Sequence, residues 1–114
     1  MKRIEALFYK TNSGNEPVRE WLVNDLGKRD RQTVGMDLKD VEYGWPVGMP
    51  LCRRITSEKG LWEVRSNISG GRIARVLFCI YGGKMILLHG FIKKTQKTPQ
   101  KDIDLAVKRM KEGV

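Results

Sequence analysis

The chain has 114 residues, 40% of them hydrophobic, and carries a formal net charge of +9. This length fits one small domain spanning residues 1–114, and the apolar content argues against disorder. No apolar run approaches the ~20 residues that span a bilayer, and the charged N-terminus is unlike a signal peptide, so we expect a cytoplasmic protein. Cys52 and Cys79 lack CxxC spacing and are expected to be free thiols.

The positive charge is confined to one half of the chain. Residues 1–50 hold eight basic and eight acidic residues, whereas residues 51–114 hold fourteen basic and five acidic ones. Such an imbalance predicts one surface that faces a polyanion. The partner would be a nucleic acid or an acidic protein, and a merely soluble basic face is the remaining alternative.

In the N-terminal half we expect one strand and two helices. The segment "RIEALFYK" alternates apolar and polar residues, and "NSGNEP" ends it before a helix capped by Asn15. Gly27 is suited to end that helix, and a second helix follows Asp30. Apolar residues at helical spacing define a stripe on each helix: Val18, Trp21, Leu22 and Leu26, then Val34, Leu38, Val41 and Trp45.

Beyond residue 50 the hydrophobic period changes to two. Four strands are predicted from "LCRRI", "LWEVRS", "RIARVLFCIY" and "KMILLHGFI", with glycine turns between the last three. A final helix is predicted from Thr98, as cap, and Pro99, as first residue. The order indicates an α+β fold: an antiparallel-dominated sheet of about five strands, two N-terminal helices on one face and a C-terminal helix. We expect the other sheet face to stay uncovered.

Strand alternation directs ionisable side chains toward that second face. Arg65 and Arg75 share it with His89 and a lysine from Lys93–Lys94, while Leu88 would point the other way. Guanidinium groups bind phosphate oxygens, lysine adds a mobile charge, and histidine transfers protons near neutral pH. Each residue also fits a plainer interpretation: surface ion pairs for the arginines, a packed histidine, and a solvated lysine turn.

The same residues indicate the kind of phosphodiester chemistry available. No carboxylate cluster is present to hold Mg²⁺, and two cysteines with one histidine form no recognisable zinc site, so no metal or cofactor is expected. A nuclease of this composition would use the RNA 2′-hydroxyl as nucleophile and leave a cyclic phosphate. A non-catalytic face that binds a polyanion fits the residues as well.

Three segments resemble a known family. "LWEVR", "ARVLF" and "LLHGFIKKTQKTP", with the earlier "EPVREWL", are similar to the RelE/HigB toxin superfamily, and most of all to its phage-derived Gp49-like branch. The resemblance implies a RelE-like fold and the toxin of a type II toxin–antitoxin pair. Such toxins are metal-independent ribonucleases that cut mRNA in the ribosomal A site and inhibit translation.

The motifs also imply roles for individual residues. Arg65 and Arg75 match the arginines of two successive strands and would hold the scissile phosphate, and His89, Lys93 and Lys94 match the H-G-F-x-K-K run that would move protons. The branch commonly has tyrosine where this chain has Ala74, a change we expect to affect packing. Further contacts with RNA are expected from four basic residues: Arg53, Arg54, Arg72 and Lys97.

The resemblance also implies partners. We expect a cognate helix-turn-helix antitoxin, a monomer when the toxin is free and a hetero-oligomer when it is bound. Two alternatives to an active ribonuclease stay open. One is a non-catalytic module that binds RNA or antitoxin and takes part in autoregulation of its operon, and the other is an inactivated toxin.

Overall fold

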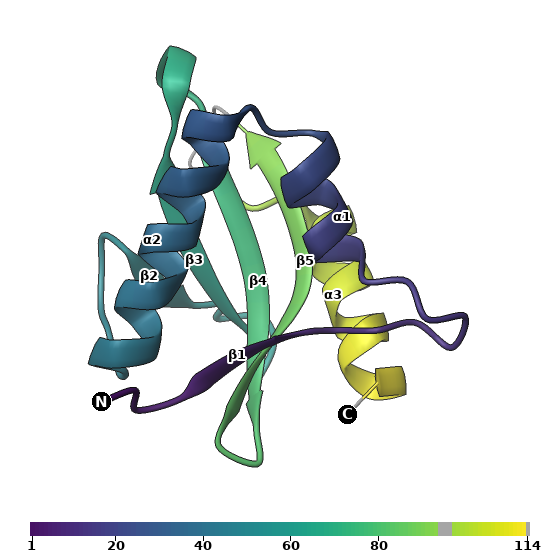
Figure 1. The fold of residues 1–114 in the computed structure, drawn as a ribbon. Helices are drawn as coiled ribbons and strands as arrows, with labels where there is room; N and C mark the ends of the chain where they lie inside the picture. Colours follow the sequence, from purple (N-terminus) through teal and green to yellow (C-terminus); the bar gives the residue numbers. More distant parts are fainter. Residues whose placement is uncertain (94–96, 114) are drawn as a thin grey trace.

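The computed structural model describes residues 1–93 and 97–113. Within those residues the chain forms three α-helices and one five-stranded sheet (Figure 1). In chain order the elements are β1 (Glu5–Phe8), α1 (Pro17–Asn24), α2 (Lys28–Gly44), β2 (Cys52–Arg54), β3 (Trp62–Asn67), a short 3₁₀ turn (Ser69–Gly71), β4 (Ile73–Tyr81), β5 (Lys84–Lys93) and α3 (Gln100–Gly113). The predicted α+β class is confirmed, and the arrangement is consistent with the RelE-like fold.

The sheet has the order β1-β5-β4-β3-β2 and is open at both edges. Strands β2 to β5 form the expected antiparallel meander, because short connections join each strand to the next. Strand β1 adds to the far edge, parallel to β5, with Leu7 opposite Ile86. The long central strands β4 and β5 therefore each have a hydrogen-bonded strand on both sides.

One face of the sheet packs against α1 and α2. The helical stripes predicted from the sequence supply the buried side chains, such as Val18 of α1 and Val34 of α2, which join Val76 and Phe78 of β4 in one core. The helix boundaries differ slightly from the prediction. Glu16, not Asn15, precedes α1, and Gly27 directly precedes α2.

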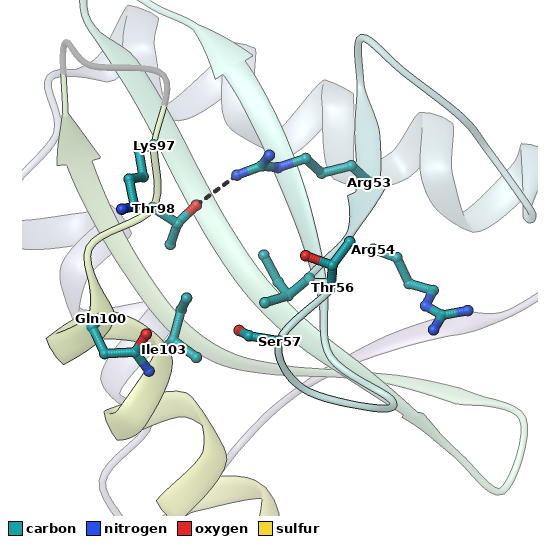
Figure 2. A pocket seen from close by; sticks show the side chains of 9 residues that line it. Arg53, Arg54, Thr56, Ser57, Lys97, Thr98, Gln100 and Ile103 are labelled. Atoms are coloured by element: carbon teal, nitrogen blue, oxygen red, sulfur yellow. Dashed lines mark hydrogen bonds between the residues drawn. The ribbon is translucent and has the colours of Figure 1, made fainter.

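The other face packs against α3, so the prediction that it stays uncovered is wrong. Ile103 and Ala106 of α3 form a second core with Leu77 of β4 and Phe91 of β5. An amphipathic helix needs an apolar surface to cover its stripe, and the inward positions of β4 and β5 provide one. A cleft on this face lies between the N-terminal end of α3, strand β2 and the loop that follows β2 (Figure 2).

The pairing of β4 with β5 shifts register between Leu77 and Phe78. Leu77 pairs with His89 but Phe78 pairs with Leu87, so Leu88 is an extra residue in β5. Leu88 consequently lies in the second core on the same face as His89, and the alternation that placed it opposite is wrong there. Among the described residues, no helix has the length and apolar character to cross a membrane.

Candidate functional site

A buried pair of opposite charges lies at the centre of the α3 face. The side chains of Glu63 on β3 and Arg75 on β4 are both 0% exposed, with Nη1 of Arg75 4.0 Å from Oε2 of Glu63. Burial of a charged group is costly unless opposite charges and hydrogen bonds compensate for lost water. The neighbours of this pair are therefore expected to supply compensating charges and hydrogen bonds.

Two further arginines converge on the same carboxylate. Arg53 of β2 lies directly opposite Glu63 in the sheet and donates from Nε to Oε1 at 2.9 Å. Arg65, opposite Arg75 in the register, places its Nε 3.7 Å from the same oxygen. We call Arg53, Arg65, Arg75 and Glu63 the arginine cluster: it joins three guanidinium groups to one carboxylate.

Thr98, just before α3, forms hydrogen bonds with this cluster. Its hydroxyl donates to Oε2 of Glu63 and accepts from Nη2 of Arg53 at 2.9 Å and from Nη1 of Arg75 at 3.4 Å. The prediction that Thr98 caps the helix with Pro99 as its first residue is wrong. Helix α3 begins at Gln100, and the carbonyl of Pro99 accepts the first helical hydrogen bond, from Ile103.

A cleft of about 280 Å³ opens beside Thr98, between β2, the loop that follows it and the start of α3 (Figure 2). We call it the basic cleft. Its lining consists of Arg53, Arg54, Ile55, Thr56, Ser57, Lys97, Thr98, Gln100 and Ile103. The lining combines cationic side chains with hydroxyl and amide groups, and none of these described residues carries a carboxylate. Such a surface suits an anion with several oxygen atoms.

The side chains of Arg53 and Arg54, adjacent in β2, point in different directions. Figure 2 shows Arg53 reaching toward Thr98, whereas Arg54 points away from it. Successive residues of a strand project to opposite sides, which explains the difference. The side chain of Arg53 is 33% exposed, so it contacts both the cluster and solvent.

The structure brings Arg65 and Arg75 together as predicted, but neither lines the basic cleft. Burial lowers the pKa of Arg75, and Arg65 and Arg53 lower it further, while Glu63 opposes this shift. Arg75 remains a cation because guanidinium does not lose its proton in proteins. Arg65 instead lines two other grooves, of about 220 and 290 Å³, and Asn67 lines both of them as well.

The other predicted basic residues lie in separate parts of the structure. Lys97 lines the basic cleft. Arg72 lies apart from the cleft lining, and its Nη2 donates to Asp30 of α2 at 2.8 Å. Lys93 is the last residue of β5 and is partly buried, and the prediction for Lys94 falls outside the described residues.

His89 connects β5 to α3 rather than lining the cleft. Its Nε2 lies 2.7 Å from Oδ1 of Asp102, and its ring stacks on Phe91 with centroids 5.3 Å apart. Burial lowers the pKa of His89, and this effect exceeds the opposing effect of the hydrogen bond and charge of Asp102. An imidazole that is held by Asp102 and stacked on Phe91 fits the packed histidine that the sequence left open as an alternative.

Sequence reasoning missed Glu63 and Thr98 as members of the site. The alternation in "LWEVRS" places Glu63 on the same face as Arg65, and this is the signal in the sequence that could have found it. Nothing local in the sequence indicates that Thr98 turns toward the sheet. Across the part of the chain that the structure describes, no group of three or more His, Cys, Asp or Glu side chains is placed to hold a metal ion.

Comparison with known proteins adds one finding. A family model described as phage-derived protein Gp49-like (DUF891) matches residues 20–111. The match includes β2 to β5, most of α3 and every residue that lines the basic cleft. No curated protein matches the chain.

Proposed function

We propose, from the premise that the chain belongs to the Gp49-like family of phage-derived proteins, that it is an mRNA-cutting toxin. The family itself favours a toxin of a toxin–antitoxin pair. The finer proposal is a metal-independent endoribonuclease that acts on mRNA in the ribosomal A site, inhibits translation and is held inactive by a helix-turn-helix antitoxin.

The basic cleft is the observation that supports this activity best. It places Arg53 and Lys97 beside the hydroxyl groups of Thr56 and Ser57 and the amide of Gln100. Arginine and lysine stabilise negative charge on phosphate oxygens, and hydroxyl and amide groups hydrogen-bond to ribose and base edges. Because none of the described residues that line the cleft is aromatic, we expect the cleft to bind the sugar–phosphate backbone rather than stack a base.

In the proposed reaction the RNA 2′-oxygen attacks the adjacent phosphorus. The bond from phosphorus to the 5′-oxygen breaks, the 2′-proton leaves to a base, and the 5′-oxygen gains a proton. The products are a 2′,3′-cyclic phosphate and a 5′-hydroxyl. Arg53 takes the phosphate-contacting role that the resemblance implies for Arg65 and Arg75, since Arg75 is buried and neither of the two lines the basic cleft. The assignment of proton transfer to His89, Lys93 or Lys94 stays a prediction.

The test compares growth arrest by the wild-type protein with arrest by Arg53→Ala. Arg19→Ala is the matched control, because Arg19 is an exposed arginine on α1, which covers the opposite face. We expect Arg53→Ala to lose arrest and Arg19→Ala to retain it. Equal arrest by Arg53→Ala and wild type at equal protein levels contradicts the role of Arg53. A wild-type protein that leaves no cyclic-phosphate ends on mRNA in a translating extract contradicts the activity.

One observation favours a second candidate, a non-catalytic module that binds RNA or antitoxin. Arg75, which the resemblance places on the scissile phosphate, has no exposed surface. Two results together distinguish this module from the enzyme. The wild-type protein would bind RNA with an affinity that falls steeply as salt rises, and it would cut no RNA on ribosomes.

A further inference from the structure

The arginine cluster carries more positive than negative charge. Three guanidinium groups surround the single carboxylate of Glu63, and Arg65 and Arg75 lie directly opposite each other in the sheet. Like charges in such positions repel each other. Glu63 therefore holds together a group that would otherwise separate, while leaving positive charge for an external anion.

The hydrogen bonds of Thr98 leave it no capacity for a ligand. A hydroxyl has one proton and two lone pairs. The proton goes to Glu63, and the lone pairs accept from Arg53 and Arg75. Thr98 is also buried, so its role is to join the start of α3 to the arginine cluster.

Arg53, in contrast, keeps donors available. Its Nε is used by Glu63 and one N–H of Nη2 by Thr98. Among the described residues, no hydrogen bond from Nη1 of Arg53 is found. Since guanidinium has five N–H groups, three face neither Glu63 nor Thr98. A side chain fixed by two partners loses little further freedom when it binds a ligand.

We propose that Glu63 and Thr98 are positioning residues, which hold the guanidinium of Arg53 in the basic cleft so that its free N–H groups bind a phosphodiester oxygen of RNA. The inference rests on the proposed function only in taking RNA as the source of the phosphate. Neither residue touches the substrate. Both act through Arg53, and loss of either one lets that side chain move.

The affinity for an RNA that cannot be cut tests the positioning role of Thr98 and Glu63 separately from catalysis. The probe is a short 2′-O-methyl RNA, with affinity measured by fluorescence anisotropy at fixed salt. Thr98→Val keeps the shape of the side chain without the hydroxyl, and we expect it to weaken binding about tenfold, as loss of a hydrogen bond to a charged group does. Thr98→Ser restores the hydroxyl and should bind nearly as the wild type does. Equal binding by Thr98→Val and wild type, or equally weak binding by Thr98→Ser and Thr98→Val, overturns the proposal.

A second pair of variants separates positioning from general stability. Glu63→Gln and Glu42→Gln each remove a buried carboxylate, but Glu42 lies on α2, where it accepts from the amide of Ala6 and pairs with Lys2. We expect only Glu63→Gln to weaken RNA binding in folded protein. If both variants weaken binding equally, Glu63 has no special role. If Glu63→Gln fails to fold, the comparison of Thr98→Val with Thr98→Ser still tests the positioning role.

These outcomes are distinct from failure of the proposed function. A wild-type protein that never cuts RNA, yet binds it in a way that depends on the Thr98 hydroxyl, refutes the nuclease and leaves the positioning role intact. Thr98→Val that stops cleavage without changing RNA affinity refutes the positioning role and leaves the nuclease intact.

Discussion

Replacement of Gly90 by alanine should destabilise the protein, although the substitution adds a single methyl group. Gly90 lies in β5 opposite Val76 and faces the indole ring of Trp21 on α1. A Cβ atom at this position would lie 2.3 Å from Cε3, 2.6 Å from Cζ3 and 2.8 Å from Cδ2 of that ring. A rigid ring has no flexible end that can yield, so α1 must move away from the sheet.

The size of the effect follows from this overlap. Overpacking by a methyl group that forces backbone shifts typically costs about 1–3 kcal/mol. A loss of about 2 kcal/mol is expected here, because three atoms of the ring overlap with the new carbon. For a domain of this size, a loss of about 2 kcal/mol lowers the melting temperature by roughly 8 °C.

Urea unfolding of four proteins measures the effect: wild type, Gly90→Ala, Trp21→Ala and the double variant. The clash is absent without the indole, so the two substitutions should couple by about 1–2 kcal/mol. Gly35→Ala is the matched control. Gly35 lies in α2 with no atom near its would-be Cβ, and alanine should stabilise the helix by about 0.5–1 kcal/mol. A stable Gly90→Ala protein, or additive effects with Trp21→Ala, would refute the reasoning.

Three further predictions concern titration, thiol reactivity and salt. Because burial lowers the pKa of His89 below its ordinary value of 6.5, the unfolded chain binds the proton more readily, and the free energy of unfolding should fall as pH decreases below about 6.5. His89→Gln should flatten this dependence in urea titrations at several pH values, and an unchanged pH profile would contradict the assignment. Burial, aided by the charge of Glu63, raises the pKa of Cys52 to about 12, and burial also raises the pKa of Cys79. Both thiols should therefore resist a thiol reagent at pH 8 until urea unfolds the protein, and rapid labelling of the folded protein would show the opposite. RNA affinity should decrease steeply as salt rises from about 50 to 200 mM, since cationic contacts release counterions, and an affinity independent of salt would exclude phosphate contacts.

The sequence was most informative where one local pattern decides the structure. Period-two alternation located β3, β4 and β5, and helical spacing located α1 and α2, because burial of one face imposes those periods. The "HGFIKKTQKTP" run and its companions indicated the Gp49-like family, and the family model confirms that assignment. Alternation also placed Arg65 and Arg75 on one face, where the structure has them.

Tertiary structure decided which of those side chains face solvent. Burial depends on what packs above a strand, and the position of α3 over β4 and β5 cannot be read from their own residues. That packing buried Arg75 and tied His89 to Asp102, and it left Arg53 at the surface.

The turn of Thr98 toward the arginine cluster and the extra residue in β5 have the same origin. Each depends on partners far apart in the chain, as when Thr98 meets Glu63 from 35 residues away. The sequence by itself determined the elements, the family and the shared face of the arginines. Only the three-dimensional packing determined that the basic cleft lies at Arg53 and Lys97, because exposure is a property of the assembled layers and not of any single strand.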